Sequence, residues 1–106
     1  MILRTPDIYT TSQFDKWYNS IKDRVAKRAI NVRITRLGMK LFGDCKRISQ
    51  DVSELRINVG PGYRIYFTKK GNKVILLLVG GDKSSQEKDI KLAKELAKED
   101  IDFAKE

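Results

Sequence analysis

A chain of 106 residues with 41% hydrophobic side chains and a formal net charge of +8 can bury one modest core, so we expect a single domain over residues 1–106. Its lone cysteine, Cys45, excludes an internal disulfide and suits a reducing cytosol, and the absence of histidine argues against a zinc or other metal site. No apolar run approaches the roughly 20 residues that span a bilayer, and no basic segment after Met1 leads into a long apolar one. We therefore expect a cytoplasmic protein that needs no cofactor and meets no membrane.

The beginning of the chain predicts a short strand and a first helix. Residues 2–10 include the β-prone segment Ile8–Thr10, which would form a strand at the edge of a sheet. Thr11 or Ser12 would then cap a helix. The apolar residues of this helix recur at helical spacing: Phe14, Trp17, Tyr18 and Ile21.

A second helix is expected over residues 23–37, with Gly38 as its stop. The residues expected to face inward are Val25, Ala29 and Val32, with Leu37 as a further candidate. Only a short connection separates the two helices, so they would form an antiparallel hairpin. Residues 38–52 are rich in polar and turn-forming residues and are expected to be a loop.

Two strands are expected over residues 53–59 and 63–68, on either side of Gly60-Pro61-Gly62. A three-residue loop would give an apolar face with three cross-strand pairs: Val59–Tyr63, Ile57–Ile65 and Leu55–Phe67. The same register places Arg56, Arg64 and Tyr66 on the opposite face, because side chains alternate along a strand. With helices on the apolar face, we expect this opposite face to stay partly open and to suit an anion.

The last third predicts a buried strand and a closing helix. Residues 74–79 form an uninterrupted apolar run, typical of a strand buried on both faces. Gly80-Gly81 would form a loop, and Ser84 with Glu87 would make a capping box at the start of the helix. The packed side of this helix would hold Ile90, Ala93, Leu96 and Ala97, and residues 99–106 would fray. This order predicts an α+β domain, in which an N-terminal helical hairpin packs on an antiparallel meander with a C-terminal helix.

Positive charge is concentrated in the middle of the chain. Residues 22–47 hold nine Lys or Arg against Asp23 and Asp44. A solvated helix face is the ordinary explanation for such a run. A binding surface for a polyanion or an acidic protein is the alternative, and the imbalance makes the two about equally plausible.

Three strings of the sequence resemble a known family: Ser53–Ile57, Gly60–Phe67 and Leu78–Gln86. They are similar to the addiction-module killer proteins, a branch of the RelE/ParE toxin superfamily close to HigB. The Phe14–Trp17 segment and the Asp89–Lys94 segment match as well, and the resemblance covers residues 8–98. It implies the RelE-like toxin fold.

The resemblance also implies a function, that of the toxin of a type II toxin–antitoxin pair. Toxins of the RelE and HigB type cut messenger RNA in the ribosomal A site without a metal. By resemblance, Arg56 and Arg64 take the place of basic residues on the hairpin, and Lys83 that of a basic residue after the last strand. Tyr66 shares their face and completes the implied catalytic set. The implied partners are the ribosome with its messenger RNA and a cognate antitoxin, a small helix-turn-helix DNA-binding protein.

Two departures from the family leave the general acid and base open. Glu54 stands where relatives carry a second lysine, and Asp89 lies near the position where some carry a catalytic tyrosine. Without histidine, the proton of the attacking 2′-hydroxyl would pass to Tyr66, to one of these two carboxylates, or to a lysine of depressed pKa.

The basic segment would face ribosomal RNA, or an acidic segment of the antitoxin would cover it. The residues chosen for RNA contact are Arg33, Arg36, Lys40, Lys46 and Arg47.

Two other functions stay open. A ParE-like toxin shares this fold and inhibits DNA gyrase without cutting RNA. A plain nucleic-acid-binding module would use residues 22–47, although only Phe42 there would stack on bases. Residues Arg56, Arg64 and Lys83 favour the nuclease, but apart from the family resemblance the two arginines look like ordinary solvent-side residues of a half-exposed sheet.

Overall fold

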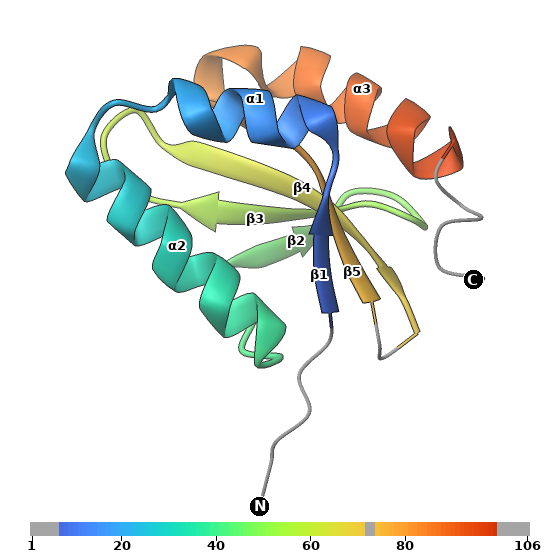
Figure 1. The fold of residues 1–106 in the computed structure, drawn as a ribbon. Coiled ribbons are helices and arrows are strands. Elements are labelled where there is room, and N and C mark those ends of the chain that lie inside the picture. Colours follow the sequence, from blue (N-terminus) through green and yellow to red (C-terminus); the bar gives the residue numbers. More distant parts are fainter. Residues whose placement is uncertain (1–6, 72–73, 100–106) are drawn as a thin grey trace, which may run out of the picture.

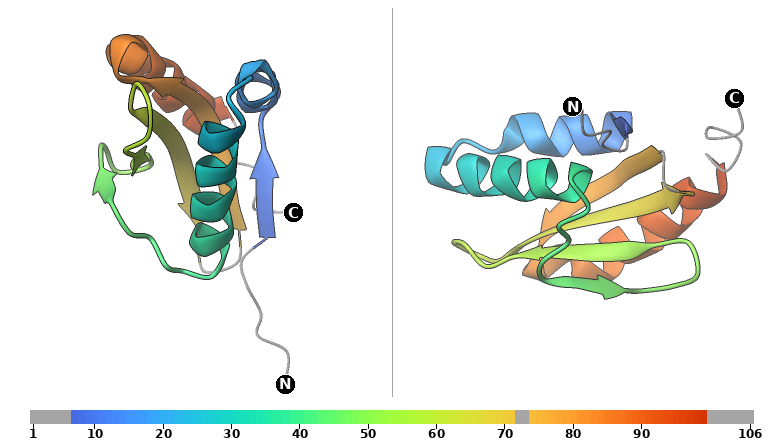
Figure 2. Two further views of the ribbon diagram at one scale, coloured as in Figure 1. Left: turned by 90° about the vertical axis from the view of Figure 1, so that its left-hand side faces the viewer. Right: turned by 90° about the horizontal axis from the view of Figure 1, so that it is seen from below.

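The computed structural model describes residues 7–71 and 74–99. They form a five-stranded sheet in the order β1-β5-β4-β3-β2, with α1 and α2 on one face and α3 on the other (Figures 1 and 2). The strands are β1 (Asp7–Thr10), β2 (Cys45–Arg47), β3 (Ser53–Ile57), β4 (Tyr63–Lys70) and β5 (Val74–Asp82). The helices are α1 (Ser12–Ser20), α2 (Arg24–Gly38) and α3 (Gln86–Glu99), with a 3₁₀ turn, η1 (Lys83–Ser85), before α3. The predicted α+β fold, with its helical hairpin, meander and C-terminal helix, is confirmed.

The two outer strands differ from the predicted meander in instructive ways. At one edge, β1 pairs in parallel with β5, and the Thr11 side chain both caps α1 and donates to the Leu78 carbonyl oxygen at 2.5 Å. At the other edge, β2 pairs with β3 in antiparallel fashion. The expectation that residues 38–52 are loop throughout is therefore wrong at Cys45–Arg47. Three residues give too little periodicity to reveal a strand. The predicted start of the first strand at residue 2 and the frayed tail beyond Glu99 lie outside the described residues.

The hairpin of β3 and β4 has the predicted faces but a different register. Ile57 pairs with Tyr63 and Arg56 pairs with Arg64, so five residues, 58–62, connect the strands instead of three. Within this loop, the Gly62 N–H donates to the Val59 carbonyl at 3.0 Å, and Gly62 has a φ of 80°. The predicted pairing is wrong by two residues. Such a shift leaves every side chain on the same face, which is why the alternation of the sequence did not reveal it.

Helix α1 buries the predicted residues, whereas α2 buries Leu37 and packs Ala29 as predicted but turns the two predicted valines outward. Phe14 is buried, and Trp17, Tyr18 and Ile21 pack around it. On α2 the buried side chains are those of Ala26, Ile30 and Leu37. Val25 and Val32 are 70% and 41% exposed, so the prediction that they face inward is wrong. Both stripes have helical spacing, and the one with the larger side chains packs on the sheet.

Both faces of the sheet are covered. The core between the sheet and the α1–α2 hairpin includes Leu55, Ile65 and Phe67, and the core beneath α3 includes Leu78, Ala93 and Leu96. Because α3 lies over β4 and β5, the expected open face is covered (Figure 2). No helix among the described residues is long and apolar enough to cross a membrane.

Candidate functional site

A fully buried carboxylate, Glu54 on β3, is the centre of the polar side chains beneath the start of α3. Its Oε1 accepts a hydrogen bond from Arg56 Nε at 3.0 Å, and its Oε2 accepts one from Gln86 Nε2 at 2.7 Å. Burial alone would raise the pKa of Glu54, but these donors and the nearby charge of Arg64 hold that pKa below its ordinary value. Glu54 is therefore ionised, and it joins β3 to the first turn of α3.

Arg64 lies on β4, opposite Arg56 on β3 and Gly81 on β5, and is only 7% exposed. Its Nε is buried and has no hydrogen-bond partner among the described residues. A buried donor without a partner costs about 1–3 kcal/mol, and natural proteins keep such groups mainly where they serve a purpose. A guanidinium held in this way is suited to bind an anion.

Tyr66 is the cross-strand neighbour of Glu54 and is fully buried. Burial, reinforced by the adjacent Glu54 carboxylate, raises the pKa of the Tyr66 phenol well above its ordinary value. Its hydroxyl, like Arg64 Nε, is buried without regular hydrogen-bond geometry to any described residue. Tyr66 thus stays protonated at neutral pH and is suited to donate a proton or a hydrogen bond, not to act as a base.

Asp89 on α3 is the second buried carboxyl of this region, at 9% exposed. Its Oδ2 accepts a hydrogen bond from Ser85 Oγ at 2.5 Å. Burial raises the pKa of Asp89, and the bond from Ser85 offsets part of that rise. A side chain on Gly81 would place its Cβ 1.9 Å from Oδ2, so the missing side chain at Gly81 is what lets Asp89 approach the strand beside Arg64.

The start of α3 differs from the predicted capping box. Asp82, not Ser84, is the capping residue, and it caps the turn η1 that leads into α3, because β5 continues through Gly80 and Gly81 to Asp82. Trp17 packs against Gly80 from the opposite face of the sheet, where a Cβ on Gly80 would lie 2.0 Å from Trp17 Cε3. The prediction that the glycine pair forms a loop is wrong, since the two glycines admit close packing from opposite faces of the sheet.

Lys83 lies at the margin of this site. It is exposed in η1, and its Cδ lies 3.7 Å from where a Cβ on Gly62 would be. It forms no ion pair with any residue in the described part of the chain. The structure thus gathers Arg56, Arg64 and Tyr66 around one carboxylate and leaves Lys83 beside the β3–β4 loop. Within residues 7–71 and 74–99, no three His, Cys, Asp or Glu side chains come together to hold a metal ion.

Comparison with known proteins assigns the family. The family model described as "Phage derived protein Gp49-like (DUF891)" matches residues 12–106. The chain belongs to the Gp49-like family. This Gp49-like protein is also 48% identical over 95 residues to an uncharacterized protein of Haemophilus influenzae, across 90% of this chain and 96% of that protein.

A solved structure supports the fold of this Gp49-like protein. A chain in the crystal structure of the archaeal RelE–RelB complex from Pyrococcus horikoshii OT3 matches with a TM-score of 0.59, covering 74% of this chain and 96% of that chain. The sequence identity is 19%, so this likeness concerns the fold. The predicted RelE-like fold is confirmed, and the assignment to the HigB branch stays a prediction.

Two of the residues predicted to contact RNA, Arg33 and Arg47, hydrogen-bond the backbone of this Gp49-like protein. The Arg33 guanidinium donates to the backbone carbonyls of Arg56, Phe42 and Asp44, which ties α2 to β3 and to the loop before β2. Arg47 donates to two carbonyls of the turn that follows β2. Both arginines are thus engaged with the backbone of the protein itself.

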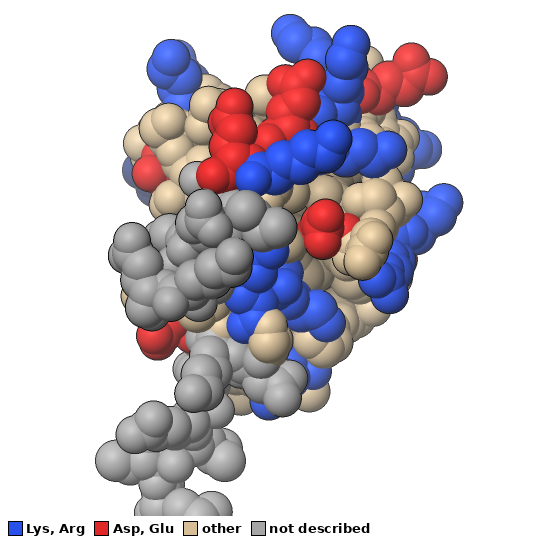
Figure 3. Space-filling model, turned by 90° about the vertical axis from the view of Figure 1, so that its right-hand side faces the viewer, with Lys and Arg blue, Asp and Glu red and all other residues tan. Residues whose placement is uncertain are grey.

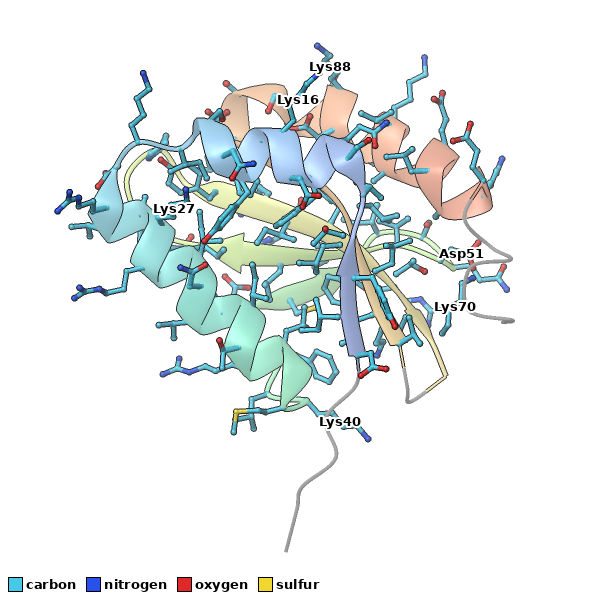
Figure 4. All side chains as sticks on the ribbon, viewed as in Figure 1. Lys16, Lys27, Lys40, Asp51, Lys70 and Lys88 are labelled. Carbon is cyan, nitrogen blue, oxygen red and sulfur yellow. The ribbon has the colours of Figure 1, made fainter. Side chains whose placement is uncertain are left out.

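The other three predicted RNA contacts are exposed. Lys40 follows α2 with a φ of 63°, and Figure 4 shows its side chain pointing away from the sheet. Lys46 lies on β2, and Arg36 lies on the outer side of α2. Their roles stay predictions.

Sequence reasoning missed three members of the site: Gly81, Ser85 and Gln86. All three belong to the string Leu78–Gln86, which supports the family resemblance but does not by itself indicate which of its residues join the site. The alternation of β3 does place Glu54 on the face of Arg56, so that ion pair was open to prediction. The approach of Gln86 and Asp89 depends on how α3 docks, for which the sequence carries no local signal.

Proposed function

We propose that this Gp49-like protein is the toxin of a type II toxin–antitoxin pair, close to the HigB branch, and that it cuts messenger RNA on the ribosome without a metal in the bacterial cytoplasm. The family, the RelE-like fold and the pairing of the archaeal neighbour with RelB support a toxin with a cognate antitoxin. The observation that carries the nuclease proposal is Arg64, a buried guanidinium with an unpartnered Nε beside Arg56.

The proposed reaction is an attack of the ribose 2′-oxygen on the adjacent phosphorus. The bond from phosphorus to the 5′-oxygen breaks, which leaves a 2′,3′-cyclic phosphate and a free 5′-hydroxyl. Negative charge grows on the phosphate oxygens during this step. Arg64 would stabilise that charge through its planar donors, with Arg56 beside it.

Asp89 is the best supported proton acceptor for the 2′-hydroxyl. The fully buried Glu54 has both oxygens occupied and a lowered pKa, so it holds protons weakly. Tyr66 keeps its own proton. Asp89 has a raised pKa and lies beside Gly81, the strand neighbour of Arg64. A carboxyl whose pKa is raised by burial accepts a proton more readily than an ordinary one.

Lys83 is the proposed proton donor at the other end of the reaction. The exposed side chain of Lys83 passes beside the β3–β4 loop, and its ammonium would protonate the departing 5′-oxygen. The Tyr66 phenol is fully buried, so it would act through its neighbours Glu54 and Arg64 and not by touching the RNA. Lys40, Lys46 and Arg36 would contact RNA through its phosphates, whereas the backbone hydrogen bonds of Arg33 and Arg47 favour structural roles for those two residues.

The experiment that tests this proposal is induced expression in bacteria, with growth followed and messenger ends mapped by primer extension. Wild type and the exposed-surface control Arg24→Ala should stop growth and generate new cuts within translated messages. Arg64→Ala should do neither, and Arg64→Lys should cut more slowly, with circular dichroism showing that both proteins fold. Normal cutting by a folded Arg64→Ala protein would remove Arg64 from the active site.

One observation favours a second candidate, a ParE-like toxin that inhibits DNA gyrase. Glu54 already neutralises part of the charge of Arg56 and Arg64, which leaves less positive charge for a phosphate than two unpaired arginines would offer. Growth arrest with DNA breaks and without messenger cuts in the same expression experiment would favour this candidate.

A further inference from the structure

The outer side of α2 carries a groove that shares only Arg36 with the RNA contacts proposed above. Its volume is about 650 Å³, and all of its lining residues come from α2 and the segment just after it. They are Arg24, Lys27, Arg28, Asn31, Val32, Thr35, Arg36, Met39 and Leu41. We call this surface the α2 groove. Helix α2 has 15 residues, so the groove follows a helix roughly 22 Å long.

The apolar part of the α2 groove is unusually exposed. Val32, Met39 and Leu41 are 41%, 51% and 56% exposed, and together they make up three of the five large hydrophobic side chains exposed in the described residues. Single exposed apolar residues are normal, but a contiguous patch with a polar rim marks an interaction site.

The rim of the α2 groove carries charge of one sign. Four of its nine lining residues are Lys or Arg, and none is acidic. The face seen in Figure 3 is different, since blue and red side chains are intermingled over its upper part, where α3 ends. The α2 groove therefore selects an anionic partner.

The shape of the α2 groove is fixed by hydrogen bonds. The Asn31 Oδ1 accepts from the Tyr18 hydroxyl at 2.6 Å, and the Lys27 ammonium lies 4.5 Å from the centre of the Tyr18 ring. The Leu41 N–H donates to the Arg36 carbonyl at 2.8 Å, which holds Leu41 against the end of the helix. A surface ordered in advance loses less entropy on binding.

Protein fits this groove better than RNA does. Its lining contains no aromatic side chain on which a base would stack, and the phosphate backbone gains nothing from exposed Val, Met and Leu. A helix with one apolar stripe flanked by Asp and Glu matches both the floor and the rim. We propose that the α2 groove binds such an acidic amphipathic helix of the antitoxin, an inference that rests on the proposed toxin function for the identity of the partner.

The test uses a fluorescein-labelled synthetic peptide of about 20 residues, with leucines on one helical face and glutamates on both flanks. Fluorescence anisotropy should show binding to the full chain, and Val32→Glu should raise Kd about tenfold or more. Val25→Glu is the matched control, because Val25 lies on the same helix, is 70% exposed and does not line the groove. Its Kd should stay within about twofold of wild type.

A second pair separates charge in the groove from charge in general. Arg36→Glu should weaken binding, whereas Lys40→Glu, an equal change of charge outside the groove, should weaken it much less. The peptide should also bind the Arg64→Ala protein normally. Failure of the nuclease proposal would therefore leave this result unchanged, and failure of peptide binding would leave messenger cutting unchanged.

Five results would overturn the inference. Equal binding of a scrambled peptide of the same composition, or equal loss in Val25→Glu and Val32→Glu, would mean unspecific charge attraction. Binding of a single-stranded RNA that Val32→Glu abolishes, without peptide binding, would make the groove an RNA surface. A dimer in analytical ultracentrifugation that Val32→Glu dissociates, again without peptide binding, would assign the groove to a second copy of the chain. Failure of the peptide to bind the wild-type chain would also exclude the proposed docking.

Discussion

Replacing Glu54 by Gln tests whether its charge holds the site together. The amide has nearly the same shape, and the Gln86 amide is able to turn end for end, so both hydrogen bonds of Glu54 survive without its negative charge. A hydrogen bond to a charged group contributes about 1 kcal/mol more than a neutral one. Two such bonds give a loss of about 2 kcal/mol. The bond from Arg56 contributes the smaller part of this loss, because the Arg56 side chain is one-third exposed to solvent.

Urea unfolding of wild type and Glu54→Gln at several pH values measures this loss. The folded-state pKa of Glu54 lies below its unfolded value of 4.5, so its contribution is fully present above pH 4.5 and disappears as the pH falls through the folded-state pKa. The difference in the free energy of unfolding between the two proteins should be constant near neutral pH. It should shrink below pH 4.5, where the wild-type carboxyl becomes protonated and resembles the amide.

Glu87→Gln is the control for Glu54→Gln, since Glu87 is an exposed carboxylate in the first turn of α3. Its cost should stay within about 0.5 kcal/mol. A loss in Glu54→Gln that is no larger than in this control, or one that is the same at pH 7 and pH 3.5, would refute the electrostatic role of Glu54.

Four other substitutions probe separate features of the structure. Tyr66→Phe removes a buried hydroxyl without regular hydrogen-bond geometry, so the free energy of unfolding in urea should change by less than about 1 kcal/mol. Primer extension should show slower cutting if the phenol serves the reaction. Gly81→Ala sets a Cβ 1.9 Å from Asp89 Oδ2 and should cost about 1–3 kcal/mol in thermal unfolding, with Asp89→Ala restoring part of the loss; independent, additive effects would contradict the contact. Arg33→Lys loses the fork that reaches three carbonyls and should destabilise by about 1–2 kcal/mol, whereas Arg36→Lys should be neutral in the same urea assay. Asp89→Asn should stabilise the protein at pH 7 and not at pH 3, because a raised carboxyl pKa means that ionisation opposes folding. The same substitution should abolish messenger cutting. Lower stability at pH 7 would refute the raised pKa of Asp89.

The hairpin shows how far the sequence determines this fold. Alternation along residues 53–67 sorted Leu55 and Ile65 from Arg56 and Arg64 correctly, because the period of a strand depends on the backbone alone. The register depends on the loop, and loops of three and five residues keep the same alternation. The loop seen in the structure has Gly60 and Gly62 at φ of 55° and 80°. Glycine adopts positive φ values about as readily as negative ones, so its presence in the sequence does not reveal which loop forms.

The coverage of the sheet was harder to predict than its faces. Arg64 and Tyr66 on one strand face suggested exposure, yet α3 covers them by packing Ala93 and Ala97 close to the sheet. Similarly, Val25 and Val32 had the spacing of a buried stripe and lie outside, where Val32 contributes to the α2 groove. In both cases local pattern gives the periodicity of an element, and the docking of a distant element decides which side is buried.

The two buried carboxyls of the site show the same limit at the level of chemistry. In the sequence, Glu54 and Asp89 were equivalent candidates for the proton acceptor. In the structure their pKa values move apart, since Glu54 is held by donors from Arg56 and Gln86 while Asp89 is buried with only Ser85 as a side-chain donor. Two carboxyls with opposite shifts of pKa allow a division of roles, in which Glu54 stays charged and positions the arginines and Asp89 exchanges the proton. Loss of cutting in Asp89→Asn at raised stability, beside loss of stability in Glu54→Gln, is the pair of results that this division requires.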